Sequence, residues 1–141
     1  MQVREIMTSN PACCTRQTSL DEVAQLMVEY DCGAIPVVES MQNQRPVGIV
    51  TDRDICIRTV ARGENPLELT AGDIMSRPVI TVRPTDSLDE CIRVMEENQI
   101  RRVPICDDEG RLVGILSQAD IAREAPAEET AEVVREVSQP L

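Results

Sequence analysis

Two short segments of the sequence place a hydroxyl and a carboxylate at the same spacing. The first is G-I-V-T-D-R-D, with Thr51 and Asp54, and the second is G-I-L-S-Q-A-D, with Ser117 and Asp120. In each, the hydroxyl follows a β-rich run and the carboxylate lies three positions later, in the first turn of an expected helix. A carboxylate there can accept hydrogen bonds from both hydroxyls of a ribose, as in dinucleotide-binding folds. The hydroxyl and the amides at the helix start can bind a phosphate or the sugar.

The same spacing also has a purely structural interpretation. Thr51 and Ser117 are good helix caps, and each carboxylate would lie where the helix dipole favours negative charge. Two copies in register weaken this interpretation without removing it.

Arginines supply the positive charge that a phosphate would need, since the sequence contains no lysine. Arg101 and Arg102 precede an expected strand, and Arg53 lies inside the first hydroxyl–carboxylate segment. The guanidinium fork suits phosphate oxygens, although an exposed arginine pair also serves solubility. The first-half positions that correspond to Arg101 and Arg102 are Gly33 and Ala34, so we expect the two halves to bind anions unequally.

Composition excludes several classes of function. The net charge of -11 argues against nucleic-acid binding, and the absence of histidine removes the usual general base and the commonest metal ligand. With no catalytic constellation and no metal-ligand spacing, we expect neither an enzyme nor a metal site. No apolar run resembles a signal peptide or a membrane span, so we expect a soluble cytoplasmic protein that does not bind membranes.

Six cysteines occur without a C-x-x-C spacing, which favours reduced thiols. Cys32, Cys91 and Cys106 fall at apolar positions, and we expect them to be buried. Cys13 and Cys14 are adjacent and could form a redox pair, although a vicinal disulfide is strained.

An internal repeat organises the chain. Ile6 and Met7 recur as Ile74 and Met75, a shift of 68 (74 − 6), and Gly48 recurs as Gly114, a shift of 66 (114 − 48). Ser19 to Glu22 recur at the first shift, and Asp54 and Ile55 recur at the second. A two-residue difference in a hairpin loop explains the change of shift.

Each half is predicted to fold as βαββα. Capped helices begin near Ser19 and Ser87, hairpins join the runs 34–38 with 47–51 and 103–106 with 112–116, and short extended pieces near 12–15 and 79–82 supply the first strands. The predicted organisation is repeat 1 over 1–62, a linker over 63–72, repeat 2 over 73–125 and an acidic tail over 126–141. The halves should pack by a pseudo-twofold into one α/β (α+β) module.

Two apolar sets are expected to pack against other parts of the molecule. The first helix is expected to bury one face, made of Leu20, Val23, Ala24, Met27 and Val28. The tail is either solvated or forms a short helix, which could pack three valines on a partner subunit, namely Val133, Val134 and Val137.

The paired h-x-P strands and G-h-h-[ST]-x-x-D-h segments resemble a tandem pair of CBS (cystathionine β-synthase) domains, also called a Bateman module, over about residues 4 to 124. The chain is similar to small stand-alone bacterial CBS-pair proteins of the hypoxic-response type. The resemblance implies a disc with two clefts for AMP, ADP, ATP or S-adenosylmethionine. The favoured cleft would use Ala12, Cys32, Gly33, Arg101, Arg102, Ser117 and Asp120. The second would use Thr51, Arg53, Asp54, Ile80 and Ile100.

The resemblance implies a regulatory sensor without an obligatory cofactor, with AMP the favoured ligand. It would signal as a homodimer, because such pairs commonly dimerise through exposed apolar helix faces, or through an effector protein. An interaction or scaffold protein with vestigial clefts is the alternative, and a binder of S-adenosylmethionine is a further one.

Overall fold

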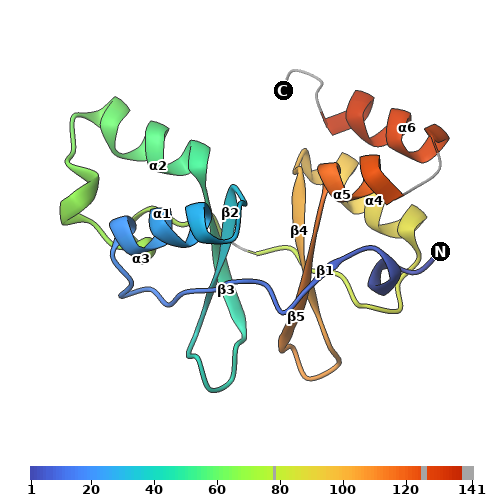
Figure 1. Ribbon diagram of the computed structural model, residues 1–141, viewed down its shortest axis with the longest axis horizontal. Helices are drawn as coiled ribbons and strands as arrows, with labels where there is room; N and C mark the ends of the chain where they lie inside the picture. The colour runs from blue at the N-terminus through green and yellow to red at the C-terminus, as the bar shows by residue number, and fades with distance from the viewer. Residues whose placement is uncertain (78, 125–126, 138–141) are drawn as a thin grey trace. The chain divides into compact units, whose positions relative to one another are not determined.

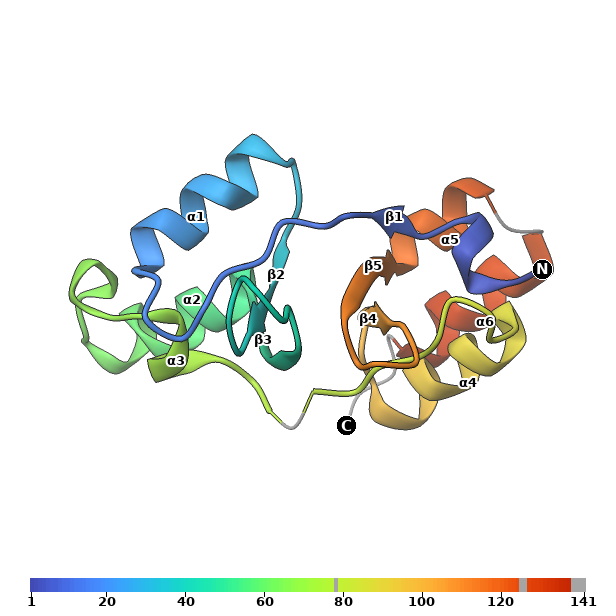
Figure 2. The same cartoon turned by 90° about the horizontal axis from the view of Figure 1, so that it is seen from below.

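The computed structural model describes residues 1–77, 79–124 and 127–137, and it forms two compact units of mixed helices and strands (Figures 1 and 2). Unit 1 comprises Met1–Pro11 together with Ile80–Leu141, and unit 2 comprises Ala12–Val79. The fold class is therefore α+β, as predicted. None of the described helices is long and apolar enough to cross a membrane.

Unit 2 is built on a hairpin of strands β2 (Ala34–Val38) and β3 (Pro46–Thr51). Helix α1 (Leu20–Glu29) precedes the hairpin and helix α2 (Asp52–Arg58) follows it directly. All five residues of β2 are buried. The remaining short elements are η2 (Val60–Arg62), η3 (Pro66–Glu68) and α3 (Ala71–Ile74).

Unit 1 repeats this plan with an additional strand and an additional helix. Strands β4 (Arg102–Cys106) and β5 (Leu112–Ser117) form the hairpin, and β1 (Thr8–Ser9) pairs with the other edge of β5. The remaining elements of unit 1 are η1 (Val3–Glu5), α4 (Leu88–Asn98), α5 (Gln118–Glu124) and α6 (Ala127–Val137).

The expected first strand of each repeat is shorter than predicted. Cys14 forms a single parallel bridge with Val37, and Val82 forms one with Ile105. Around Cys14 the backbone donates to the Pro36 carbonyl at 3.0 Å and accepts from the Val38 amide at 2.7 Å. The extended pieces therefore add one pairing position to each hairpin, because only one residue of each piece is in register.

Helices α1 and α4 begin where the sequence predicted. The hydroxyls of Ser19 and Ser87 accept hydrogen bonds from the amides three positions on, at 3.4 Å and 3.1 Å. These contacts satisfy amides that have no partner inside the helix. Helix α1 and helix α4 thus start at equivalent repeat positions, as a duplicated sequence requires.

The two units exchange segments relative to the sequence repeats. Met7 from the first repeat packs over Gly114 of β5, and Met75 from the second packs over Gly48 of β3. Backbone pairing follows the same exchange, since β1 pairs with β5 in unit 1 while Ser76 pairs with Ile49 in unit 2. Each compact unit is therefore assembled from parts of both predicted repeats, whose boundaries stay a prediction.

The face that α1 buries is narrower than predicted. Leu20 and Val23 enter the core and Met27 packs against it, as expected. Ala24 is exposed and Val28 is 83% exposed, so their predicted burial is wrong. Helical spacing shows which residues share a face, but it does not show whether a neighbouring element covers that whole face.

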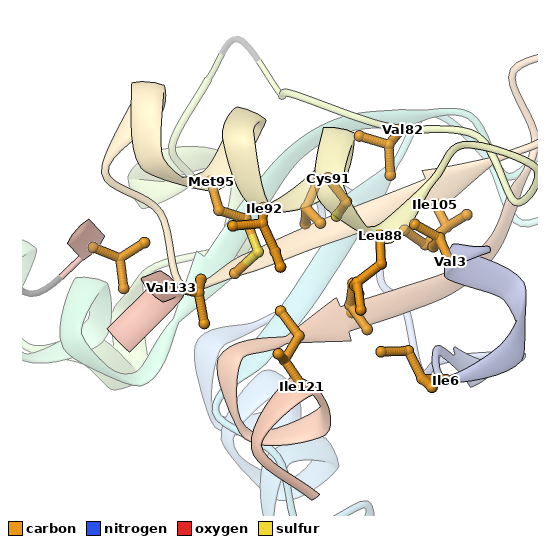
Figure 3. Close-up of a cluster of buried hydrophobic side chains, with 13 residues drawn as sticks. Val3, Ile6, Val82, Leu88, Cys91, Ile92, Met95, Ile105, Ile121 and Val133 are labelled. Atoms are coloured by element: carbon orange, nitrogen blue, oxygen red, sulfur yellow. The ribbon is translucent and has the colours of Figure 1, made fainter. Parts of the chain in front are cut away.

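The acidic tail forms helix α6, which packs on α4 and α5 in both views (Figures 1 and 2). Val133 is fully buried and Val137 is 5% exposed within the core of unit 1, while Val134 is 38% exposed. Figure 3 shows Val133 beside the core that contains Ile92 and Ile121. A solvated tail is therefore wrong for the part of α6 that contains Val133 and Val137. Two of the three valines are buried in their own unit, so a partner does not bind them as predicted.

The cysteines are free thiols in three environments. Burial raises the pKa of Cys14 to about 12, of Cys91 to about 12 and of Cys106 to about 11. Burial also raises the pKa of the half-buried Cys13. Cys32 is exposed, contrary to prediction, because it lies in the turn after α1, where its thiol is 3.6 Å from the Ala34 carbonyl oxygen. Cys56 is also exposed.

We expect Cys32 and Cys56 to react within seconds to minutes with a thiol-specific disulfide reagent at pH 8, because both are exposed. Cys14, Cys91 and Cys106 should stay unmodified until the protein unfolds, since a buried thiol of high pKa forms little thiolate. Stopped-flow absorbance with a count of thiols in denaturant measures both classes. Fast modification of all thiols in the native protein would contradict the core described here.

Candidate functional site

The hydroxyl–carboxylate pair of unit 1 lies where β5 ends and α5 begins. The Ser117 amide donates to Asp120 Oδ2 at 2.9 Å, and the Asp120 amide donates to Ser117 Oγ at 3.1 Å. Asp120 is only 5% exposed, and its second oxygen, Oδ1, lies 2.5 Å from the guanidinium of Arg123.

Unit 2 repeats the same geometry at the junction of β3 and α2. The Thr51 amide donates to Asp54 Oδ2 at 3.0 Å, and the Asp54 amide donates to Thr51 Oγ1 at 3.1 Å. Ser76 Oγ contacts the same carboxylate oxygen at 3.4 Å, and Arg58 Nε lies 3.7 Å from Oδ1. Both segments singled out in the sequence are therefore reciprocal helix caps.

Capping leaves part of each carboxylate free to bind a ligand. An ionised carboxylate has about four acceptor positions on its two oxygens, and the contacts of Asp120 given above use two of them. Its Oδ1 faces Arg123, whose side chain is 67% exposed. The cap and a role as acceptor for ligand hydroxyls are therefore compatible.

Arg58 and Arg123 were not predicted as site residues. They lie four and three positions after Asp54 and Asp120, where a residue on a helix reaches the carboxylate one turn earlier. The spacing D-x-x-x-R or D-x-x-R was therefore visible in the sequence. Each arginine would either compete with a ligand for the carboxylate or bind the same ligand beside the carboxylate.

The amides at the start of α2 are less available than the sequence suggested. The Asp52 amide donates to the Gly33 carbonyl at 2.9 Å, and the Arg53 amide donates to Asp52 Oδ1, also at 2.9 Å. The Asp54 amide already donates to Thr51. At this helix start the described amides are used internally, so a phosphate would have to be bound by guanidinium groups instead.

Arg101 and Arg102 differ in environment although they are adjacent. Arg102 opens β4, is half-buried and lies opposite Ser117 in the hairpin register, whereas Arg101 is exposed just before the strand. The Arg101 carbonyl accepts from the Gln118 amide at 2.8 Å, which fixes the backbone beside the cap. Arg53, on α2, is exposed.

The predicted clefts draw residues from both units. Unit 1 brings four members of the favoured cleft together, namely Arg101, Arg102, Ser117 and Asp120. The other three members belong to unit 2: Ala12 packs on its core, and Gly33 accepts a hydrogen bond from the first turn of α2 just after the exposed Cys32. That these two sets meet stays a prediction.

The second predicted cleft is divided in the same way. Thr51, Arg53 and Asp54 lie together in unit 2. Ile80 and Ile100 lie in unit 1, where both are half-buried and Ile100 packs against the core. The combination of the two sets stays a prediction here too.

Carboxylates and thiols do not converge on a metal site in the described parts of the chain. No group of three or more Cys, Asp or Glu side chains there could hold a metal ion. Histidine, the commonest protein ligand of zinc and related metals, is missing from the sequence.

Comparison with known proteins gives a consistent result. The model of the CBS domain family matches residues 3–58 and 71–127. Hypoxic response protein 1 of Mycobacterium tuberculosis is 38% identical over 138 residues, which cover 98% of this chain and 94% of that protein. The protein MK0525 of Methanopyrus kandleri is 39% identical over 123 residues, and the chain spans 59% of its length.

Solved structures similar to this chain include other proteins with CBS domain pairs. Hypoxic Response Protein I with two coordinated zinc ions is 40% identical, with a TM-score of 0.78 over 89% of this chain and 100% of that one. The CBS domain pair of protein MJ0100, with 5-methylthioadenosine and S-adenosyl-L-methionine, is 29% identical, with a TM-score of 0.77 over 87% and 94%. CBSX2 in complex with AMP is 28% identical, with a TM-score of 0.71 over 88% and 95%.

Proposed function

Because the chain belongs to the CBS domain family, with two copies of the domain, we propose that it is a cytoplasmic sensor of an adenine nucleotide without catalytic activity of its own. AMP is the favoured ligand. The bound nucleotide would shift the population between two arrangements of the chain, and a homodimer or an effector protein would detect the shift.

The observation that carries the proposal is the duplicated cap with its buried carboxylate. Asp54 and Asp120 are 8% and 5% exposed, and they lie at equivalent junctions with free acceptor capacity. Two hydroxyls of a ribose are donors that match such an acceptor. Proteins similar to this chain bind AMP or S-adenosyl-L-methionine, both of which carry this ribose.

The adjacent arginines favour a phosphate-bearing ligand. The favoured cleft has three arginines near the Ser117–Asp120 cap in the sequence, namely Arg101, Arg102 and Arg123, of which Arg123 pairs with Asp120. The second cleft has two near Asp54, namely Arg53 and Arg58, of which Arg58 pairs with Asp54. Gly33 and Ala34 replace the arginine pair in the other repeat. We therefore propose stronger binding of phosphate at the cleft that contains Asp120, with S-adenosylmethionine as a weaker alternative ligand.

A scaffold function is the second candidate. It is favoured by the observation that each cap is complete without a ligand, since both oxygens of Asp120 already have partners. In that case no adenine compound would bind, and the folded pair would act only as a binding surface.

A thermal-shift experiment separates the two candidates. At AMP concentrations about 100 times Kd, binding adds about 2.7 kcal/mol to the stability, which corresponds to a rise in Tm of roughly 10 °C for a chain of this length. Asp120→Ala should remove most of this rise, because it removes the acceptor for the ribose hydroxyls.

The control for that variant is Asp73→Ala. Asp73 closes the same kind of cap on α3, where its carboxylate accepts from the Thr70 amide at 2.9 Å, and it lies outside both predicted clefts. Each substitution should lower the stability by about 1 kcal/mol through loss of a cap, but only Asp120→Ala should lose the response to AMP. If no adenine compound shifts Tm, the scaffold function stands instead.

A further inference from the structure

The exit segment, residues 74–76, consists of the last residue of α3 and the two residues after it, shortly before the chain passes into unit 1. It pairs with β3, because the Ser76 amide donates to the Ile49 carbonyl at 2.9 Å and the Ile49 amide donates to the Ser76 carbonyl at 3.1 Å. Ile74 and Met75 are 4% and 6% exposed in the core of unit 2. The exit segment is therefore firmly held by unit 2.

Two side chains connect the exit segment to the carboxylate of Asp54. Ser76 Oγ donates to Asp54 Oδ2 at 3.4 Å. Arg58 Nε lies 3.7 Å from Asp54 Oδ1, while Arg58 Nη1 donates to the carbonyls of Ile74 and Met75 at 3.1 Å and 3.4 Å. We call Arg58 and Ser76 the Asp54 links. Through them the exit segment contacts the carboxylate that is proposed to bind a ribose.

The equivalent positions of unit 1 carry different groups. The shift of 66 aligns Arg58 with Glu124 (124 − 58), which is exposed and has no N–H to donate to a carbonyl. The shift of 68 aligns Ser76 with Thr8 (76 − 8), which is exposed as well. Asp120 is instead paired with an arginine of its own helix. Within the described parts of the chain, the Asp54 links therefore belong to unit 2 alone.

A ribose bound at Asp54 competes with the Asp54 links. An ionised carboxylate has about four acceptor positions on its two oxygens, and the Thr51 amide and the Ser76 hydroxyl take two of them on Oδ2. A pair of ribose hydroxyls bound one to each oxygen displaces Ser76, and a pair bound to Oδ1 alone displaces Arg58. Either arrangement breaks one connection between the carboxylate and the exit segment.

We propose that a nucleotide bound at Asp54 loosens the exit segment, because its ribose displaces Ser76 or Arg58 from the carboxylate. This inference rests on the proposed function and deepens it. The cleft that contains Asp54 transmits its occupancy to the chain that leads into unit 1, whereas the cleft that contains Asp120 binds without this response. Arg58 and Ser76 are positioning residues, since they act on the ligand only through Asp54.

The Asp54 links and the ligand oppose each other, so each weakens the other by the same factor. Loosening of the exit segment by AMP therefore requires that AMP bind more tightly once a link is removed. The loss of one hydrogen bond changes such an equilibrium by about threefold. A role of Arg58 and Ser76 in folding alone predicts no gain in affinity.

Ser76→Ala tests the competition in the Asp120→Ala background, where the cleft that contains Asp54 is the one that remains. Removing the hydroxyl frees an acceptor position on Asp54 Oδ2, so Kd for AMP should fall about threefold. Titration followed by NMR measures Kd. Thr8→Ala in the Asp54→Ala background is the matched control, because Thr8 is the exposed equivalent of Ser76 in unit 1. Its Kd should not change.

Amide hydrogen exchange measures the loosening directly. In the unsubstituted protein, saturating AMP should speed exchange of the Ser76 amide about threefold. Arg58→Gln removes the donor to the exit segment, so the same amide should exchange faster without ligand and AMP should add little. Arg58→Lys keeps a cationic donor and should restore part of the response to AMP.

The outcomes separate this inference from the proposed function. An affinity for AMP that Ser76→Ala leaves unchanged, or slower exchange of the Ser76 amide with AMP in the unsubstituted protein, overturns the inference and leaves the proposed function standing. If AMP binds to none of the variants and not to the unsubstituted protein, the proposed function is wrong and this inference is wrong with it.

Discussion

Replacing Val133 by aspartate is expected to lower the free energy of unfolding of unit 1 by about 3 kcal/mol or more. The substitution removes a fully buried apolar side chain and puts an unpaired carboxyl in the same core. Its neighbour Val134 is 38% exposed on the outer side of α6, so Val134→Asp should change the stability by less than about 0.5 kcal/mol.

Urea unfolding followed by circular dichroism measures both variants under identical conditions. The pair is matched in composition, charge and position in the helix, so the difference between them reports burial alone. Equal losses in the two variants would falsify the packing of α6 against α4 and α5. Such a result would return the C-terminal residues to the solvated tail considered from the sequence.

Gly114→Ala is expected to cost about 2 kcal/mol of stability. A Cβ at Gly114 would lie 2.5 Å from Met7 Sδ and 3.1 Å from the backbone oxygen of Thr8. The methionine can move, but the backbone oxygen of β1 is held by pairing with β5. Combining Met7→Ala with Gly114→Ala should therefore cost less than the sum of the single variants, with a coupling of about 1 kcal/mol.

The control combines Gly114→Ala with Met75→Ala. Met75 precedes Gly114 within the same sequence repeat, but it packs over Gly48 in unit 2. The stability losses of this pair should add, because the two residues belong to different units. Coupling of Gly114 with Met75 in place of Met7, measured by double-mutant cycles in urea, would show that the segments are not exchanged.

Local patterns predicted most of the fold. Hydrophobic alternation and turn residues gave both hairpins, and serine caps gave the starts of α1 and α4, because these features depend on residues close in the sequence. The hydroxyl–carboxylate spacing also located both caps. The repeat itself was visible as two constant shifts along the chain.

Features that depend on distant contacts could not be predicted in this way. The apolar stripe of α1 looks the same whether or not another helix covers Val28, so its exposure was missed. The residue type of Cys32 does not show whether it lies in an exposed turn or in the core, because free cysteine occurs in both. Met7 packs over Gly114 and Met75 over Gly48, each in the unit of the other repeat. The sequence does not predict this exchange, because Met7 and Met75 are equivalent in the repeat and either could pack over either glycine.

The exchange of segments also sets the order in which the chain can fold during synthesis. Unit 2 is one continuous run, whereas unit 1 needs its first residues and its last. Thr8 pairs with Ile115, which is 107 positions later (115 − 8). At ribosomal rates of about 5–20 residues per second, β5 is synthesised roughly 5–20 s after β1, so β1 has no partner strand during that interval. During that time Val3 and Ile6 have no core to enter, while unit 2 can already be complete.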